Sequence, residues 1–280
     1  MNVSFDNRFA SSPDEVMSLD TTRLRQKFLI EKIFEADAFH FTLTHYDRFI
    51  AGGAMPVKEA LVLPNPDSLK APYFLDRREM GIINVGGTGT VTADGNSFTL
   101  QYKEALYISK GTKEVTFASA DTNAPAKFYI NSAPAHHAYP TRKVSKEEAE
   151  KVTLGSLEQS NHRTINKLLV NSVLPTCQLQ MGLTELQPGS VWNTMPAHTH
   201  DRRMEVYFYF QVPEGQSVCH FMGQPDETRH IWMQNEQAVI SPDWSIHSGA
   251  GTSNYNFIWG MAGENMDYGD MDHCKITELR

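Results

Sequence analysis

The sequence is poor in cysteine, and this limits the kinds of fold and cellular location that it can have. Only three of its 280 residues are cysteine, and Cys177, Cys219 and Cys274 stand far apart without a Cys-x-x-Cys pair. An odd number of widely spaced cysteines argues against a disulfide framework and is typical of free thiols in a reducing compartment. We therefore expect a cytoplasmic protein.

Long apolar runs and an excess of basic charge are also absent. No stretch approaches the roughly 18 apolar residues of a membrane span, and the first residues, MNVSFDNRFASSPDEVMS, lack the apolar core of a secretory signal. The formal net charge is −8 at pH 7, opposite in sign to the charge that binds a phosphate backbone. We expect neither a membrane nor a nucleic acid as a partner.

The sequence is instead rich in short β-strand patterns. Residues 39–46, FHFTLTHY, alternate apolar and polar side chains with the period of two that is typical of a half-buried strand. Asp94-Gly95, between two arms rich in Thr and Val, predicts the tight turn of a β-hairpin. Many such strands, separated by turns rich in Pro and Gly, predict an all-β sandwich or barrel.

Two short helices are expected among these strands. Asp20 or Thr21 can begin the first, which places Leu24 and Phe28 on one apolar face. A capping box made by Ser145 and Glu148 predicts the second.

An internal repeat indicates that the chain contains two units of similar plan. When the sequence is shifted by 125 residues, Tyr73–Val85 aligns with His198–Phe210 and the two Asp-Arg-Arg triplets coincide. We interpret this as a duplication. The expected division is an N-terminal barrel in residues 1–135, a polar connector in 136–165 and a C-terminal barrel in 166–280.

The residues most indicative of chemistry lie in the second unit, in the stretch MPAHTHDRRMEVYFYF. His198 and His200 are two residues apart, so that in a strand both imidazoles point to the same side. Glu205 has the wrong parity for an uninterrupted strand, and the chain must therefore turn or bulge between His200 and Glu205. His247 follows Pro242 in a later strand region. Three imidazoles and one carboxylate suit a divalent transition metal with positions open to a substrate.

The pattern His198-x-His200-x4-Glu205, followed by Pro242-x4-His247, resembles the two motifs of the cupin superfamily. One departure is that Pro242-Asp243-Trp244 replaces the usual Pro-x-Gly. Longer blocks, among them RREMGIINVGG, APAKFYINSAPAH, WNTMPAHTHDRRMEVYFYF and NEQAVISPDWSIHSG, resemble the bacterial 5-keto-4-deoxyuronate isomerase family, and this similarity runs from about Leu24 to the C-terminus.

The resemblance implies two tandem double-stranded β-helix (jelly-roll) barrels, that is, a bicupin, with one Zn²⁺ per chain and a homohexameric assembly. It implies an aldose–ketose isomerase that converts 5-dehydro-4-deoxy-D-glucuronate to 3-deoxy-D-glycero-2,5-hexodiulosonate in the breakdown of pectin-derived uronates. Carried over by position, the zinc ligands would be His198, His200, Glu205 and His247. In the N-terminal barrel Tyr73, Leu75 and Met80 occupy the corresponding positions, so that barrel is expected to bind no metal.

The groups that would move the proton and bind the substrate are less clearly marked. Strand parity and neighbourhood give four candidates for the acid or base: Tyr207, Tyr209, Glu185 and His220. A substrate carboxylate calls for an arginine, and four are available: Arg163, Arg202, Arg203 and Arg229. The four acid–base candidates could equally be structural polar groups. Most arginines on any protein are solvated, and the segments RTINK and QPDETRH favour Arg163 and Arg229 slightly.

Two other functions are compatible with the same motifs. A cupin dioxygenase would use iron in an identical donor set, and its activity would depend on oxygen. A non-catalytic sugar-acid-binding or storage cupin would not need a complete ligand set, and the four candidate ligands present here argue against that class.

Overall fold

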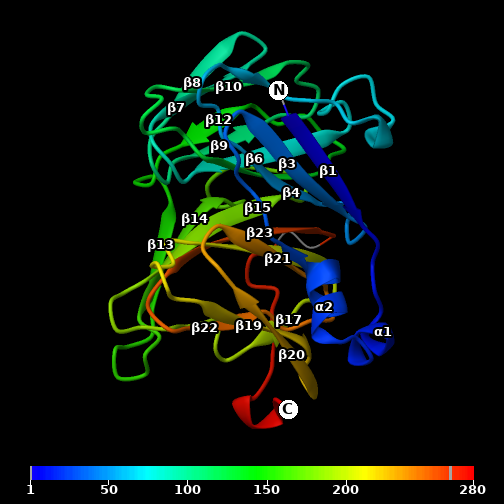
Figure 1. Ribbon diagram of the computed structural model, residues 1–280, viewed down its shortest axis with the longest axis vertical. Helices are drawn as coiled ribbons and strands as arrows, with labels where there is room; N and C mark the ends of the chain where they lie inside the picture. Colours follow the sequence, from blue (N-terminus) through cyan, green and yellow to red (C-terminus); the bar gives the residue numbers. More distant parts are fainter. Residues whose placement is uncertain (1, 265–266) are drawn as a thin grey trace. The chain divides into compact units, whose positions relative to one another are not determined.

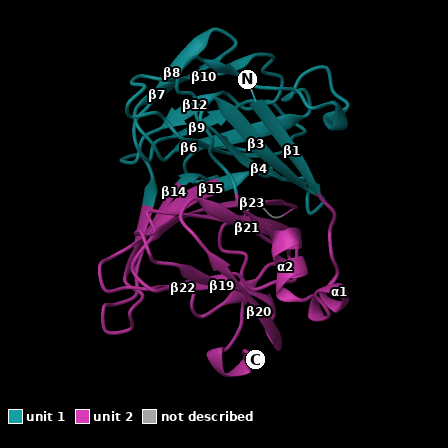
Figure 2. Cartoon of the chain, in the orientation of Figure 1, with its two compact units in different colours: residues 1–7, 32–150, 168–180 teal, residues 8–31, 151–167, 181–280 magenta. Residues whose placement is uncertain are grey.

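The computed structural model describes residues 2–264 and 267–280 as a mainly β protein (Figure 1). Within these residues no helix has the length and apolar character needed to cross a membrane. The chain forms two compact units. Unit 1 consists of residues 1–7, 32–150 and 168–180, and unit 2 consists of residues 8–31, 151–167 and 181–280 (Figure 2).

Unit 1 contains a seven-stranded and a four-stranded sheet. Across the larger sheet the strands are β1 (Asn2–Arg8), β3 (Ala38–Thr44), β4 (Ile50–Ala54), β11 (Phe128–Pro134), β6 (Arg78–Asn84), β9 (Ala105–Ile108) and β12 (Arg142–Val144). Across the smaller sheet they are β5 (Leu61–Val62), β10 (Val115–Ser119), β7 (Gly89–Ala93) and β8 (Asn96–Leu100). A 3-10 turn, η1, covers Asp67–Leu69.

Unit 2 repeats this arrangement and adds a two-stranded sheet. Its larger sheet runs β13 (Glu150–Leu154), β14 (Arg163–Leu169), β15 (Gln180–Leu186), β23 (Asn256–Gly263), β18 (Arg203–Phe210), β21 (Gln237–Ser241) and β2 (Leu29–Ile30). The smaller sheet runs β16 (Trp192–Asn193), β22 (Ser248–Gly251), β19 (Val218–Gln224) and β20 (Glu227–Met233). The added pair is β17 (His198–Thr199) with β24 (Asp272–His273), and a 3-10 turn, η2, covers Ile276–Glu278.

The two units share a strand order, which agrees with the duplication inferred from the sequence. The order β4-β11-β6-β9 in unit 1 matches β15-β23-β18-β21 in unit 2. The repeated Arg-containing strands β6 and β18 occupy the same place in the two orders. The predicted all-β fold of two barrels is therefore confirmed.

The compact units are not continuous in sequence. Residues 8–31 belong to unit 2, where β2 pairs with β21, and residues 168–180 belong to unit 1. The segment 136–165, expected to be a connector, contains β12, β13 and the start of β14. The sequence-based boundaries at residues 135 and 165 assigned one continuous segment to each barrel, and they stay a prediction.

The N-terminal helix formed as expected. α2 (Thr21–Phe28) begins after Asp20, whose carboxylate accepts a hydrogen bond from the backbone N–H of Arg23, and it buries Leu24 and Phe28. A shorter helix, α1 (Pro13–Met17), precedes it and is capped by Ser12.

The second predicted helix did not form. Ser145 and Glu148 do exchange hydrogen bonds, from the Ser145 N–H to Glu148 Oε2 at 2.8 Å and from the Glu148 N–H to Ser145 Oγ at 3.3 Å. However, they close only a turn, because the chain enters β13 at Glu150. The hairpin prediction is confirmed: β7 and β8 pair around Asp94-Gly95, whose φ angles of 44° and 83° are those of a type I′ turn.

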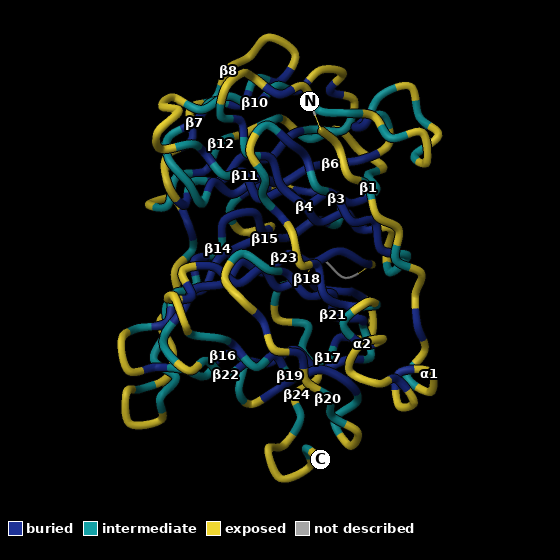
Figure 3. The backbone as a smooth tube through the Cα atoms, viewed as in Figure 1, coloured by how far each residue is buried: buried dark blue, intermediate teal, exposed yellow. Residues whose placement is uncertain are grey.

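The interior of unit 1 is an apolar core, and its sheets are mostly buried while the loops are mostly exposed (Figure 3). Aromatic rings form part of this core, with Phe39 lying 5.5 Å from both Phe41 and Phe117, measured between ring centroids. Leu75 and Met80, at two of the positions that correspond to candidate ligands in the repeat, are fully buried in it.

One carboxylate in unit 1 is completely buried. Glu79 accepts hydrogen bonds from the backbone N–H groups of Cys177, Gln178 and Leu179 and from the Tyr107 hydroxyl, each at 2.8 Å. Its side chain therefore holds residues 177–179 against β6, and both of its oxygens are already engaged and do not serve as ligands to a metal.

Replacing Glu79 with Ala should lower the free energy of unfolding by at least about 3 kcal/mol, because four donors, three of them in buried hydrogen bonds, would lose their acceptor. Denaturant unfolding of the full chain measures this change. Glu147→Ala, at an exposed position of the same unit, serves as the control and should have little effect. Equal unfolding midpoints for the two variants would contradict the structural role given to Glu79.

Candidate metal centre

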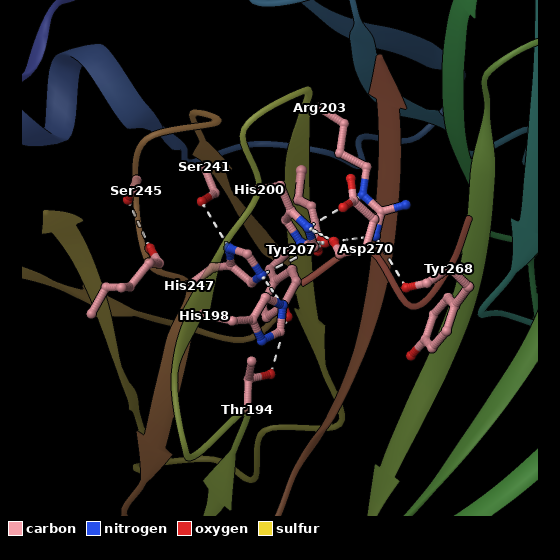
Figure 4. A network of polar contacts seen from close by, with 12 residues as sticks. Thr194, His198, His200, Arg203, Tyr207, Ser241, Ser245, His247, Tyr268 and Asp270 are labelled. Atoms are coloured by element: carbon pink, nitrogen blue, oxygen red, sulfur yellow. Dashed lines mark hydrogen bonds and ion pairs between the residues drawn. The ribbon is translucent and has the colours of Figure 1, made fainter. Parts of the chain in front are cut away.

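Four side chains converge in the interior of unit 2. One donor atom from each of His198, His200, Glu205 and His247 lies within 4.8 Å of the others, and all four residues are buried. His247 Nε2 is 2.9 Å from His198 Nε2, and His200 Nε2 is 2.7 Å from Glu205 Oε1. Figure 4 shows the three imidazoles facing one another across this point.

The local chain path explains the convergence. His198 and His200 lie on and directly after β17, and the chain turns at Asp201 and Arg202 before β18 begins. This turn places the Glu205 side chain on the same side as the two imidazoles, as the sequence predicted. His247 follows a turn in which the Ser245 N–H donates to the Pro242 carbonyl at 3.1 Å, so the turn forms without the usual glycine.

Two of the imidazoles are oriented by contacts on their outer nitrogen. The backbone carbonyl of Asp270 accepts a hydrogen bond from His200 Nδ1, and Ser241 Oγ lies 3.3 Å from His247 Nδ1. In both rings Nε2 is thereby turned toward the cluster. Contacts of this kind fix the tautomer and ring orientation of metal-binding histidines.

Burial keeps the imidazoles of His198 and His247 neutral. It lowers the pKa of His198 to about 2 and that of His247 to about 4, and the neighbouring imidazoles act in the same direction. Burial alone would raise the pKa of Glu205, but the adjacent His247 and His200 outweigh it and lower that pKa. Neutral imidazoles and an ionised carboxylate are the protonation states that bind a metal ion.

The donor set fits a divalent transition metal. His200 Nε2 is buried and makes no hydrogen bond, although Glu205 Oε1 lies close to it. His198 Nε2 and His247 Nε2 lie 2.9 Å apart, and when both rings carry their proton on Nδ1 these two nitrogens present lone pairs that one cation can accept. Three nitrogens and one oxygen are a common ligand set for zinc and related ions.

Three of the four predicted acid–base candidates lie close to the cluster. The Tyr207 ring is 5.3 Å from the His247 ring, and its hydroxyl is 3.1 Å from Thr194 Oγ1. The Tyr209 hydroxyl lies 2.8 Å from His220 Nδ1, whereas His220 Nε2 is fully buried and has no hydrogen-bond partner. Burial raises the pKa of both tyrosines and lowers that of His220 to about 3.

Glu185, the fourth candidate, lies on the other face of the sheet. A Cβ at Gly182 would collide with the Trp259 ring, so even-numbered residues of β15 face Trp259. Trp259 is paired directly with Tyr207 and shares its face. Odd-numbered Glu185 points away, and it accepts a hydrogen bond from Asn166 Nδ2 at 3.0 Å.

The four predicted arginines have different partners in the structure. Arg202 is exposed and pairs with Glu264 at 2.9 Å. Arg229 donates to the backbone carbonyls of Val16, Met17 and Leu19, and so holds the N-terminal helices on unit 2. These contacts occupy both guanidinium groups away from the cluster.

Arg203 is fully buried beside the cluster. Its guanidinium donates to the carbonyls of Asp267, Tyr268 and Asp270 at 2.8–3.1 Å, and Nε lies 3.4 Å from His200 Nδ1. Arg203 therefore holds the chain segment whose Asp270 carbonyl orients His200. Arg163, the remaining arginine, is half-buried on β14.

Sequence reasoning missed the contribution of the C-terminal segment. Residues 267–273 supply the Asp270 carbonyl and, through β24, a strand that pairs His273 with His198. The two imidazole rings of that pair are 5.6 Å apart. A backbone carbonyl has no sequence signature, and His273 stands alone in a polar stretch, so no pattern marked either group.

Comparison with known proteins gives a consistent result. Residues 29–276 match the KduI/IolB family. The chain is 62% identical over 280 residues to the 4-deoxy-L-threo-5-hexosulose-uronate ketol-isomerase of Formosa agariphila, with 100% of both chains covered.

Two solved structures share the fold at low sequence identity. An IolB-like protein from Salmonella typhimurium has a TM-score of 0.72 at 19% identity, covering 88% of this chain and 96% of that one. Bacillus subtilis oxalate decarboxylase, a protein with Mn(II) centres, has a TM-score of 0.54 at 10% identity, covering 80% and 71%. At these identities the likeness shows only that the fold is shared.

Replacing Arg203 with Lys should loosen residues 267–273, because one ammonium group cannot reach three carbonyls that a planar guanidinium spans. We expect faster amide hydrogen exchange in this segment and a loss of about 2–4 kcal/mol in the free energy of unfolding. Arg202→Lys is the matched control, since that neighbouring side chain is exposed. If exchange in residues 267–273 were equal in the two variants, the role assigned to Arg203 would be wrong.

Proposed function

The chain belongs to the KduI/IolB family and, from its 62% identity to a curated ketol-isomerase over the full length, is an isomerase; we propose that it acts on a keto-deoxyuronate with the help of a bound metal ion. The proposed reaction converts 5-dehydro-4-deoxy-D-glucuronate to 3-deoxy-D-glycero-2,5-hexodiulosonate. The observation that carries the metal dependence is the buried convergence of four donors: His198, His200, Glu205 and His247.

The reaction moves a carbonyl group between adjacent carbons of the open-chain sugar. A divalent ion held by these residues would polarise the carbonyl and stabilise the negative charge that develops on its oxygen. Imidazoles bind a metal ion in their neutral form, so one carboxylate and three imidazoles would leave the loaded site with a net positive charge.

Two side chains take different parts in the proposed proton chemistry: Tyr207 donates a hydrogen bond and His220 accepts the proton. Tyr207 stays protonated because its pKa is raised by burial, so its hydroxyl can donate a hydrogen bond to a substrate oxygen beside His247. His220 stays neutral because burial lowers its pKa, and its Nε2 has no partner. We assign Nε2 of His220 as the proton acceptor, with Tyr209 orienting the ring through Nδ1.

Further features of the function follow from the same resemblance and from particular residues. We propose zinc as the resident ion, one per chain, because the N3O set matches its preferences. The free thiols Cys177, Cys219 and Cys274 support a reducing, cytoplasmic location. A homohexamer and a place in the catabolism of pectin-derived uronates rest on the family resemblance.

Elemental analysis of the purified protein tests the metal site directly. We expect about one zinc per chain in the wild type and at least a tenfold weaker affinity in His200→Ala, since one of four ligands is lost. Isomerase activity should fall in parallel and return when zinc is added back to chelator-treated wild type. His230→Ala, at an exposed position on β20, is the matched control and should keep both metal and activity.

The same assay separates the alternatives. Full activity in metal-free protein would refute the metal-dependent mechanism. Iron in place of zinc, together with turnover that requires oxygen, would identify a dioxygenase, and a protein that binds uronates without converting them would be a binding cupin.

His220→Asn should lower kcat by about 10²–10⁴-fold, the usual contribution of a general base, with the metal content unchanged. Tyr207→Phe should lower kcat less, because it removes one hydrogen bond. Transfer through His220 would also incorporate solvent deuterium into the product when the reaction is run in D₂O. Product free of deuterium in D₂O, together with an unchanged kcat in His220→Asn, would show a direct hydride shift and would exclude His220 as the acceptor.

A further inference from the structure

We propose that Arg163 and Lys167, on one face of β14, form the subsite that binds the carboxylate of the substrate, with Tyr268 and Trp259 as its walls. This inference rests on the proposed function for the identity of the ligand, a hexuronate. The arrangement of these four side chains is observed in the structure and does not depend on that function.

The two cations lie on the face of the sheet that carries the metal cluster. Arg163 and Lys167 are four residues apart in one strand, so their side chains leave it on the same side. Lys167 Nζ lies over the Tyr268 ring, 4.3 Å from its centroid, and this ring is 5.2 Å from the Trp259 ring. Trp259 is paired directly across β18 and β23 with Tyr207. Lys167 is therefore connected through Tyr268 and Trp259 to Tyr207. The Tyr207 ring packs on that of His247.

Arg163 has the character of an anion-binding group. It is half-buried, and its only described hydrogen bond is from Nη1 to the Asn161 carbonyl at 2.8 Å, with no ion pair in the part of the chain that the structure describes. Burial lowers its pKa, while Tyr207, Tyr268 and Tyr255 lie close enough to raise it. A partly desolvated guanidinium without a carboxylate partner is ready to bind one.

A second, independent observation indicates that a polar ligand belongs here. Trp259 is 3% exposed, and its indole N–H has no acceptor. Buried donors of this kind nearly always find a partner in a protein. The benzo edge of the indole lies against β15 because Gly182 has no side chain to displace it.

A six-carbon acid can extend from the cluster along the Tyr207–Trp259 pair. Five C–C bonds place the carboxyl carbon of an extended hexuronate roughly 6 Å from its aldehyde carbon. Tyr207 and Trp259, as directly opposed residues on antiparallel strands, have Cβ atoms about 5 Å apart. A substrate with its carbonyl end at the cluster would therefore direct its carboxylate past Tyr207 toward Trp259.

The other arginines do not offer this arrangement. Arg203 is saturated by three backbone carbonyls, Arg229 is bound to the N-terminal helices, and Arg202 is exposed in an ion pair. Arg163 is thus the one predicted arginine whose guanidinium keeps most of its donors available on the cluster's face.

Calorimetric titration with D-glucuronate and with D-glucose tests the subsite on the metal-loaded protein. Arg163→Gln should weaken D-glucuronate binding by about 10- to 100-fold, the size of a lost charge-assisted interaction, and Lys167→Gln should weaken it less. D-glucose, which has no carboxylate, should bind equally to all variants. Arg163→Lys should restore part of the affinity, because it returns the charge without the planar fork.

Matched controls separate this effect from net charge and from folding. Arg23→Gln on α2 and Lys151→Gln on β13 remove the same charges at exposed positions and should leave D-glucuronate binding unchanged. Metal content and the unfolding midpoint of Arg163→Gln should stay close to wild type. In kinetics with the keto-deoxyuronate, the expected change is a 10- to 100-fold rise in KM with a smaller change in kcat.

The outcomes distinguish this inference from the proposed function. If the wild type fails to isomerise the keto-deoxyuronate but Arg163→Gln still loses D-glucuronate selectively, the subsite stands and the reaction is wrong. If isomerisation occurs and Arg163→Gln keeps the wild-type affinity and KM, the subsite is wrong. A wild type that does not bind D-glucuronate, or a variant that loses D-glucose equally, would also overturn it.

Discussion

The burial of three imidazoles and a carboxylate around one point is the constraint on which the structure of unit 2 depends. Each buried polar group without a partner costs roughly 1–3 kcal/mol, so the chain must hold these groups in place with other interactions. It does so with the turn at Asp201, the turn after Pro242 and the Asp270 carbonyl on His200. Arg203 in turn fixes the segment that supplies this carbonyl. The cluster is thus supported from three distant parts of the sequence.

Local patterns were sufficient to predict the elements of this arrangement but not their contacts. The Asp94-Gly95 turn and the helix after Asp20 depend on neighbouring residues, and both formed as expected. Three of the four candidate ligands could be grouped because the spacing of His198, His200 and Glu205 is a strand pattern joined by a bend, and His247 was added from the Pro242-x4-His247 motif. Glu185 could not be placed, since its face depends on the register of β15 against β23, and the Ser145 capping box formed its hydrogen bonds without a helix.

The arginines show where sequence reasoning ends. Arg163, Arg202, Arg203 and Arg229 are chemically equal in the sequence, and any of them could bind a carboxylate. Their roles are decided by long-range partners: backbone carbonyls for Arg203 and Arg229, and a surface carboxylate for Arg202. Because a guanidinium already bound to carbonyls has few donors left for a ligand, the availability of Arg163 is a property of the fold.

The repeat explains why only one unit carries the cluster. In the 125-residue register Met80 stands where unit 2 has Glu205, and it packs in the apolar core with Leu75, which stands where unit 2 has His200. The carboxylate of unit 1, Glu79, is one residue earlier in β6, and a shift of one residue moves a side chain to the opposite face of a strand. On that opposite face the Glu79 carboxylate accepts four hydrogen bonds. Unit 1 has therefore kept a buried glutamate near this point of the barrel as a structural acceptor, while an apolar interior replaces the metal ligands.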